Sequence, residues 1–103
     1  MGVVRYHDVS IDRDRLAEFC KAWSVKRLAL FGSILRADFR PDSDVDVLVQ
    51  FEPRAGITLL DMAEMERELT EMVGRKVDLR TPGDLSKYFR DEVLAEAEVQ
   101  YAA

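Results

Sequence analysis

Hydrophobic side chains recur at helical spacing along the first third of the chain. The spacing predicts a helix from about Asp12 to Trp23, which Ser10 or Asp12 can cap. Its apolar positions share the i, i+3, i+4, i+7 pattern of one buried face: Leu16, Phe19, Cys20 and Trp23. This face indicates a helix that packs on a neighbouring layer.

Two further helices are predicted in the second half of the chain. One begins at Thr58, with Asp61 placed as in a capping box, and ends before Gly74. Its expected buried stripe consists of Leu59, Met62, Met65, Leu69 and Met72. After a Pro82-Gly83 turn, a last helix is expected from about Leu85 to Ala97. Its apolar positions are Leu85, Phe89, Val93 and Ala97, and core packing is the expected role of Phe89 and of its neighbour Tyr88.

Strand patterns lie between these helices. Lys26–Phe31 predicts a short strand, and Ser33–Phe39 predicts one or two helical turns after it. Asp44–Phe51 alternates with period two, so its side chains divide between two faces. One face carries Val45, Val47, Val49 and Phe51, and the other carries Asp44, Asp46, Leu48 and Gln50. Arg75–Arg80 predicts a further strand.

The element order α-β-α-β-α-β-α predicts an α/β (α+β) fold, a small mixed sheet with helices packed on it. A chain of 103 residues without repeats or a long linker is expected to form a single domain over residues 1–103. Its 48% hydrophobic and 34% charged residues are typical of an ordered globular chain.

Charge and cysteine content narrow the classes of function. A net charge of −5 argues against non-specific nucleic-acid binding, and we expect no direct nucleic-acid partner. No apolar run reaches the roughly 20 residues of a membrane span, so no membrane association is expected. One cysteine, Cys20, and no pattern of a signal peptide predict a cytoplasmic protein.

The acidic residues of the alternating strand carry the first chemical prediction. Asp44 and Asp46 stand two positions apart and therefore point to the same side of the strand. Two adjacent carboxylates are unfavourable unless they share a proton or bind a cation. A hard cation such as Mg²⁺ prefers a few carboxylates as ligands, together with water and phosphate oxygens. Asp78 would supply a third ligand if its strand pairs with this one.

Gly32 and Ser33 provide a candidate phosphate site where a strand gives way to a helical turn. Glycine lets the backbone approach a ligand closely, and N–H groups at a helix start bind anions. Arg36, one turn later, could add a cation. A phosphate cradle beside a metal held by carboxylates is the equipment of nucleotidyl or phosphoryl transfer.

Each motif alone has a plainer interpretation. Asp44 and Asp46 could belong to a solvated edge strand, Gly32-Ser33 could be a turn, and Asp78 and Arg36 could be surface charges. The fixed spacing of Gly-Ser, ten residues, then Asp-x-Asp favours the joint site.

At these residues the chain resembles the minimal nucleotidyltransferase (MNT) members of the DNA polymerase β-like nucleotidyltransferase superfamily. The matching positions are Gly32, Ser33, Arg36, the run from Ser43 to Val49 with Asp44 and Asp46, and the third carboxylate Asp78. The chain departs from the pattern at Ala37, where such proteins often have glycine.

The resemblance implies a partner and a reaction. Minimal members typically act with a separately encoded HEPN-domain protein, and many such pairs are similar to toxin–antitoxin systems in which the HEPN ribonuclease is the toxin. The resemblance implies ATP as the substrate and transfer of AMP to a tyrosine of the toxin. It implies two Mg²⁺ ions held by Asp44, Asp46 and Asp78. The nucleotide-binding residues that it implies are Gly32, Ser33, Arg36 and Ser43.

Two alternatives stay open at this point. The chain could block its partner by contact alone, with Tyr88, Phe89 and Tyr101 as the docking surface. It could also be the subunit of a nucleotidyltransferase that modifies a small molecule such as an aminoglycoside antibiotic.

Overall fold

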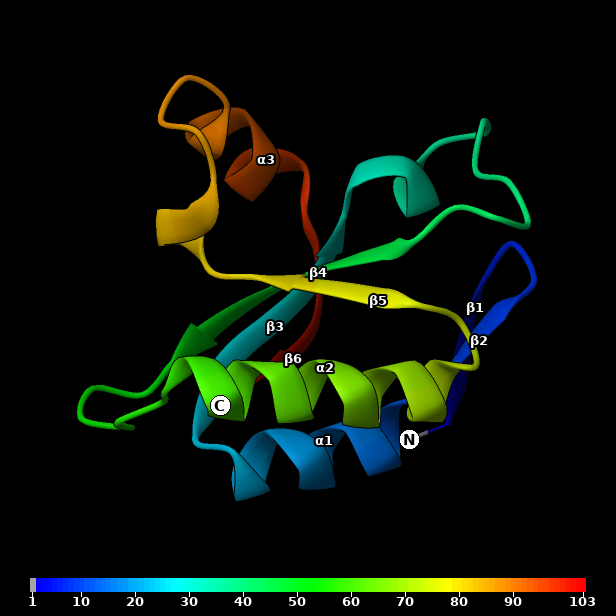
Figure 1. Cartoon of the computed structure of the whole chain (residues 1–103). Coiled ribbons are helices and arrows are strands. Elements are labelled where there is room, and N and C mark those ends of the chain that lie inside the picture. Colours follow the sequence, from blue (N-terminus) through cyan, green and yellow to red (C-terminus); the bar gives the residue numbers. More distant parts are fainter. Residues whose placement is uncertain (1) are drawn as a thin grey trace.

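A mixed sheet forms the centre of the molecule. Its strands are β3 (Val25–Phe31), β4 (Val45–Phe51), β5 (Val77–Arg80) and β6 (Glu98–Ala102), in the order β5-β4-β3-β6 (Figure 1). The computed structural model describes residues 2–103. The pairs β3–β4 and β3–β6 are antiparallel and β4–β5 is parallel, so the predicted fold class is confirmed. The parallel pair requires a long crossover, which is supplied by a helix between β4 and β5.

Two helices cover one face of this sheet. They are α1 (Arg13–Ala22) and α2 (Leu59–Val73), and Figure 1 shows both below the strands. The side chains that β3, β4 and β5 turn toward them form most of the buried core: Leu28, Leu30, Val45, Val47, Val49, Val77 and Leu79. The alternation predicted for Asp44–Phe51 therefore places its valines in this core.

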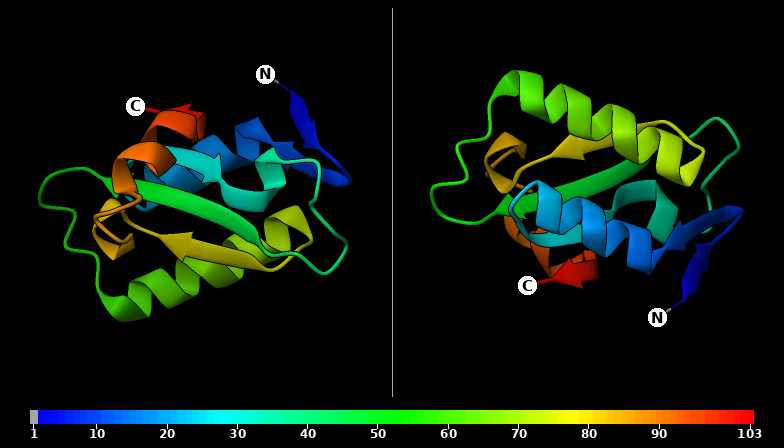
Figure 2. Two further views of the ribbon diagram at one scale, coloured as in Figure 1. Left: turned by 90° about the horizontal axis from the view of Figure 1, so that it is seen from above. Right: turned by 90° about the horizontal axis from the view of Figure 1, so that it is seen from below.

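The opposite face carries shorter elements. They are the 3₁₀ turn η1 (Gly32–Leu35), the 3₁₀ turn η2 (Pro82–Asp84) and helix α3 (Arg90–Glu96). Viewed from above, α3 and η1 lie over this face, whereas the view from below shows α1 and α2 (Figure 2). Leu48 points to this side and is only 3% exposed, and it lines a small cavity together with Leu94 and Ala97.

The N-terminal residues form a hairpin that the sequence did not predict. Strand β1 (Val3–Tyr6) pairs antiparallel with β2 (Val9–Asp12), and Val9 and Ile11 are buried. Asp12 ends β2 and caps α1 by accepting hydrogen bonds from the N–H groups of Asp14 and Arg15. Of the two predicted caps, Asp12 is the one used.

Helix α2 begins and ends where predicted, but its buried stripe is shorter. Met65 and Leu69 are buried, Met62 and Met72 are partly buried, and Leu59 is 89% exposed. The prediction for Leu59 is wrong, since this residue is exposed in the first turn of α2. This turn borders a surface pocket instead.

The C-terminal region differs most from prediction. The helix expected over Leu85–Ala97 is replaced by a turn at Ser86 and the shorter α3. Strand β6, which was not predicted, then pairs with the free edge of β3. Tyr88 and Phe89 are 81% and 61% exposed, so the expectation of core packing is wrong for both.

The other predicted helical segment is also shorter than expected. Of Ser33–Phe39, only the part within η1 is helical. Among residues 2–103, no helix combines the length and apolar character needed to cross a membrane.

The capping box of α2 gives a direct test of the fold. The Thr58 hydroxyl accepts a hydrogen bond from the Asp61 N–H at 3.1 Å, and the Asp61 carboxylate accepts one from the Thr58 N–H at 2.9 Å. Thr58→Ala is expected to lower the free energy of unfolding by about 1 kcal/mol, measured by urea titration. An unchanged midpoint would contradict this role of Thr58.

Candidate functional site

Two of the predicted acidic residues are neighbours on paired strands. In the register of the sheet, Asp46 on β4 lies opposite Asp78 on β5 and opposite Phe31, the last residue of β3. Asp44 is exposed and directly precedes β4, which begins at Val45 rather than at Asp44. The strands therefore place Asp46 and Asp78 side by side at one end of the sheet, on the face opposite α1 and α2, with Asp44 just before β4.

The carboxylate of Asp46 is the electrostatic centre of this group. Half-burial raises the pKa of Asp46, and the nearby charges of Asp78 and Asp44 raise it further. Arg80 and Arg36 act in the opposite direction. This excess of negative charge is the condition under which a bound cation is most favourable.

Arg80 holds the third carboxylate, a role that was not predicted. Its Nε donates to Asp78 Oδ1 at 3.1 Å, and its Nη2 donates to Asp78 Oδ2 at 3.2 Å. This hydrogen-bonded ion pair raises the pKa of Arg80. Residues i and i+2 of a strand face the same way, so the Asp-x-Arg spacing was the available sequence signal.

The carboxylates fit a divalent cation in part. Among residues 2–103, no three acidic, histidine or cysteine side chains are gathered closely enough to hold a metal ion. Asp78 is the carboxylate that is not available, because both of its oxygens accept hydrogen bonds from Arg80. Mg²⁺ commonly uses one or two carboxylates and completes its shell with water and phosphate oxygens, so Asp44 and Asp46 are the residues that would hold it.

Gly32 connects the predicted phosphate cradle to the carboxylates. It begins η1 with φ of 76°, and a Cβ atom there would lie 2.3 Å from Oδ2 of Asp46. Any side chain would displace the carboxylate, so only glycine permits this approach. The backbone carbonyl of Ser33, the next residue, accepts a hydrogen bond from the Arg36 N–H at 2.9 Å.

The other two predicted nucleotide-binding residues are placed differently. Arg36 is exposed, lies 3.4 Å from the Asp38 carboxylate and is close enough to lower the pKa of Asp46. Ser43 closes the loop before Asp44, where its hydroxyl accepts a hydrogen bond from the Arg40 N–H at 3.0 Å. Ser43 thus shapes the approach to the site.

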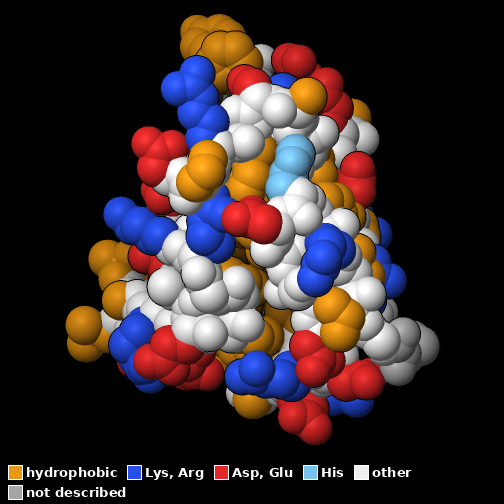
Figure 3. Space-filling view, turned by 90° about the vertical axis from the view of Figure 1, so that its right-hand side faces the viewer, with side chains coloured by type: hydrophobic (Ala, Val, Ile, Leu, Met, Phe, Trp, Pro, Cys, Tyr) orange, Lys and Arg blue, Asp and Glu red, His pale blue; other side chains and the backbone are white. Residues whose placement is uncertain are grey.

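The loop that leads into Asp44 is fastened to the N-terminal hairpin. Phe39 stacks on His7 with ring centroids 4.9 Å apart, and the Arg75 guanidinium lies 4.7 Å from the Phe39 ring centroid. Arg75 also donates to the backbone carbonyl of Ser43 at 3.0 Å. Figure 3 shows the histidine side chain, in pale blue, at the surface of the molecule. These contacts fix the chain one residue before Asp44.

A cavity of about 280 Å³ opens beside Gly32 and Arg36. Its remaining walls are Phe31 from β3 together with Phe89, Glu92, Val93 and Glu96 from α3 and its lead-in. Phe89 therefore lines this cavity instead of the core. The wall was missed because it depends on where α3 lies over the sheet, and the spacing within a helix does not reveal that position.

Comparison with known proteins finds a matching family and relatives that span most of this chain. The nucleotidyltransferase domain family matches residues 13–99. The protein adenylyltransferase MntA of Thermococcus cleftensis is 35% identical over 79 residues, which cover 77% of this chain and 78% of the relative.

Solved structures give the same assignment of the fold. A provisionally named minimal nucleotidyltransferase has 38% identity and a TM-score of 0.69, with 82% of this chain and 85% of that chain covered. A second match, with a TM-score of 0.63, is to a chain from a complex of a tri-AMPylated Shewanella oneidensis HEPN toxin with an MNT antitoxin. That match covers 88% of this chain and 70% of the other at 16% identity, so it supports the fold alone.

The crowded carboxylates predict a gain in stability when one is neutralised. The pKa of Asp46 is higher in the folded state than in the unfolded chain. Between the unfolded pKa of about 3.9 and the raised folded pKa, the folded state therefore keeps a proton that the unfolded state has lost. Stability therefore falls as pH rises through this window, and the penalty is complete above the raised pKa. Asp46→Asn is expected to stabilise the fold at pH 7 by less than about 1 kcal/mol, because solvent screens the half-buried group.

Urea titration at pH 7 and below pH 4 measures this effect. The gain should shrink at the lower pH, and Asp44→Asn should give a smaller gain because Asp44 is exposed. Destabilisation by Asp46→Asn at pH 7 would show that the carboxylate is favourably held.

Gly32→Ala tests the close approach, with Gly74→Ala as a matched control. The two glycines have φ of 76° and 75°, but a Cβ at Gly74 would meet nothing within 4 Å. Both variants should lose about 1–2 kcal/mol from the left-handed backbone. Only Gly32→Ala should also weaken the binding of a nucleoside triphosphate, measured by calorimetry with Mg²⁺. Equal affinities in the two variants would contradict the role of Gly32.

Proposed function

We propose, on the premise that the chain belongs to the minimal nucleotidyltransferases of the nucleotidyltransferase domain family, that it transfers AMP from ATP to a tyrosine hydroxyl of a HEPN-domain partner. The chain is thus an enzyme, a nucleotidyltransferase, and its proposed role is that of an antitoxin. AMP on the tyrosine would neutralise a HEPN ribonuclease toxin.

One observation carries the proposal. The backbone of Gly32 approaches the Asp46 carboxylate so closely that a Cβ atom would overlap it. A phosphate bound at the start of η1 would therefore lie beside the carboxylates of β4. That juxtaposition is what transfer of a nucleotidyl group requires.

The residues divide between two tasks in this proposal. The N–H groups and hydroxyl at Gly32 and Ser33 bind the β- and γ-phosphates, and Arg36 adds positive charge at the same place. Asp44 and Asp46 would hold Mg²⁺, and Asp78 would take the proton of the acceptor hydroxyl. Bound there, Mg²⁺ would neutralise the triphosphate and the leaving pyrophosphate.

The reaction is an in-line displacement. The tyrosine oxygen forms a bond to the α-phosphorus, and the bond from that phosphorus to the oxygen bridging the β-phosphate breaks. Pyrophosphate leaves with that oxygen, and the hydroxyl proton passes to the Asp78 carboxylate. Arg80 orients this carboxylate through both of its oxygens.

Relatives support the acceptor and the partner. One relative is named a protein adenylyltransferase, and one structural neighbour is an antitoxin in complex with an AMPylated HEPN toxin. The cavity walled by Phe31, Phe89 and Val93 offers apolar surface next to Arg36, which suits the nucleoside of ATP.

A second candidate is neutralisation by contact alone. The high exposure of Tyr88 and Phe89 favours a docking role for the segment before α3. Under this alternative the carboxylates would be dispensable for protection.

The test uses ATP labelled at the α-phosphate, Mg²⁺ and a cognate HEPN-domain protein. Label should enter the HEPN protein, whereas label at the γ-phosphate should not, and mass spectrometry should locate AMP on a tyrosine. Asp44→Asn with Asp46→Asn should lower transfer on the order of 100-fold or more, because both metal-holding groups lose their charge.

Asp42→Asn serves as the matched control, since Asp42 is an exposed acid of the same loop. Transfer that persists in the double variant would refute the catalytic assignment. A double variant that transfers nothing but still protects cells from the toxin would favour contact alone.

A further inference from the structure

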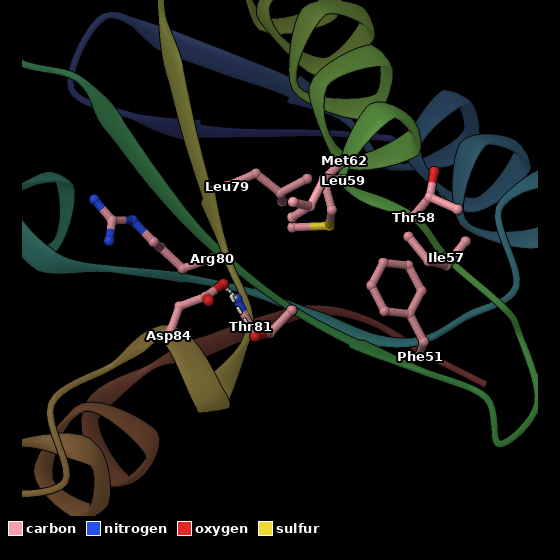
Figure 4. Close-up of a pocket in the computed structure, with 9 residues that line it drawn as sticks. All are labelled: Phe51, Ile57, Thr58, Leu59, Met62, Leu79, Arg80, Thr81 and Asp84. Carbon is pink, nitrogen blue, oxygen red and sulfur yellow. Dashed lines mark hydrogen bonds between the residues drawn. The ribbon is translucent and has the colours of Figure 1, made fainter.

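The two acidic residues near Asp46 are held in different ways. Asp78 lies within β5, where both of its oxygens accept hydrogen bonds from Arg80. The Arg80 side chain extends away from the apolar pocket of about 510 Å³ that lies beside the first turn of α2 (Figure 4). Asp44 lies outside its strand, so its position depends on the loop between η1 and β4, residues 36–44.

Three side chains from distant parts of the chain hold this loop, and we call them the loop clasp: His7, Phe39 and Arg75. His7 lies in the turn between β1 and β2, Phe39 lies in the loop, and Arg75 directly follows α2 and its cap. The Phe39 ring stacks on His7, with centroids 4.9 Å apart and planes inclined by 24°. The Arg75 guanidinium lies 4.7 Å from the centroid of the same ring.

The clasp holds the beginning of the loop through His7. Its Nε2 lies 3.0 Å from the backbone carbonyl oxygen of Ile34, within the turn η1 that begins with Gly32 and Ser33. A carbonyl oxygen only accepts hydrogen bonds, so the proton of this bond is on Nε2. The N-terminal hairpin is thereby fastened to the candidate phosphate turn.

The clasp holds the end of the loop through Arg75. Its Nη2 donates hydrogen bonds to the backbone carbonyls of Arg40 at 2.7 Å and of Ser43 at 3.0 Å. Ser43 directly precedes Asp44. The Arg75 side chain is only 16% exposed, whereas its partner in an ion pair, Asp8, is 73% exposed. The buried guanidinium therefore serves the loop more than the surface charge.

The clasp lies outside the main core. His7 is exposed, and Phe39 is only partly buried at the edge of the core. The backbone of His7 has a φ of 58°, a left-handed conformation that asparagine adopts at least as readily. Replacement of the histidine ring is therefore expected to leave the fold intact.

We propose that the loop clasp presets Asp44 against the phosphate turn at Gly32, and so prepares this carboxylate for the Mg²⁺ that it would hold. This step rests on the proposed function, which gives the loop its task. The three side chains of the clasp act through the loop and are positioning residues. A loop that is fixed beforehand loses less conformational entropy when metal and nucleotide bind.

His7→Asn and Phe39→Leu remove the clasp in two independent ways. His7→Asn loses the ring that stacks on Phe39 but suits the backbone conformation. Phe39→Leu keeps an apolar side chain but loses both the stacking and the contact with the Arg75 guanidinium.

Calorimetry with a non-hydrolysable ATP analogue at several Mg²⁺ concentrations measures the effect. Each variant should need about tenfold more Mg²⁺ than the wild type for half-maximal binding of the analogue. At saturating Mg²⁺ the affinity for the analogue should stay within about threefold of the wild type, because mass action restores the metal-bound state. AMP transfer should show the same dependence on Mg²⁺.

Asp8→Asn and Phe39→Tyr are matched controls. Asp8 follows His7 in the same turn, and loss of its exposed ion pair with Arg75 should change the Mg²⁺ requirement less than about twofold. Phe39→Tyr keeps the ring and should show the wild-type requirement. Urea titration should show that all four variants are folded under the conditions of the assay.

An unchanged Mg²⁺ requirement in either His7→Asn or Phe39→Leu would overturn the proposal. So would an equal increase in Asp8→Asn, or a loss of affinity that persists at saturating Mg²⁺, since either would indicate a general effect on the fold. If His7→Asn does not fold, the comparison of Phe39→Leu with Phe39→Tyr decides alone.

Failure of the proposed function is distinguishable from failure of the clasp. If the wild type binds the analogue with Mg²⁺ but transfers no AMP to a HEPN-domain protein, the proposed reaction is wrong. The Mg²⁺ titrations of the variants then still decide whether the clasp positions Asp44. A wild type that binds no analogue at any Mg²⁺ concentration would overturn both.

Discussion

Repulsion among carboxylates is the constraint around which this molecule is organised. Asp46 is half-buried beside Asp78 and near Asp44, and the structure places the backbone of Gly32 directly against it. A fold selected for stability alone would not gather these charges. Their arrangement is understandable if a divalent cation compensates their charge during function, while Arg36 and Arg80 compensate it in part without the cation.

The sheet separates the stabilising face from the chemical face. The valines of β4 pack on α1 and α2, and the alternating residues between them face the side of η1 and α3. Because strand periodicity is two, the same segment supplies both the core and the carboxylates. A shift of register by one residue would bury the aspartates and expose the valines, so the core also fixes the position of the site.

The parts of the fold and site that were predictable depend on local sequence. The alternation of Asp44–Phe51, the Thr58 cap and the Gly32–Ser33 turn each follow from a short segment. The β1–β2 hairpin and β6 depend on pairing with distant residues, so a helix was extended through Ala97 in place of a turn, a short helix and an edge strand. The roles of Arg80 and Phe89 became apparent only from the position of β5 and α3 relative to the other strands.

The most direct test of the central claim is a crystal structure of the protein with a non-hydrolysable ATP analogue and Mg²⁺. The account predicts electron density for a metal on oxygens of Asp44 and Asp46, with the β- and γ-phosphates at the N–H groups of Gly32 and Ser33. A nucleotide bound elsewhere, with both carboxylates directed to solvent and free of metal, would contradict it.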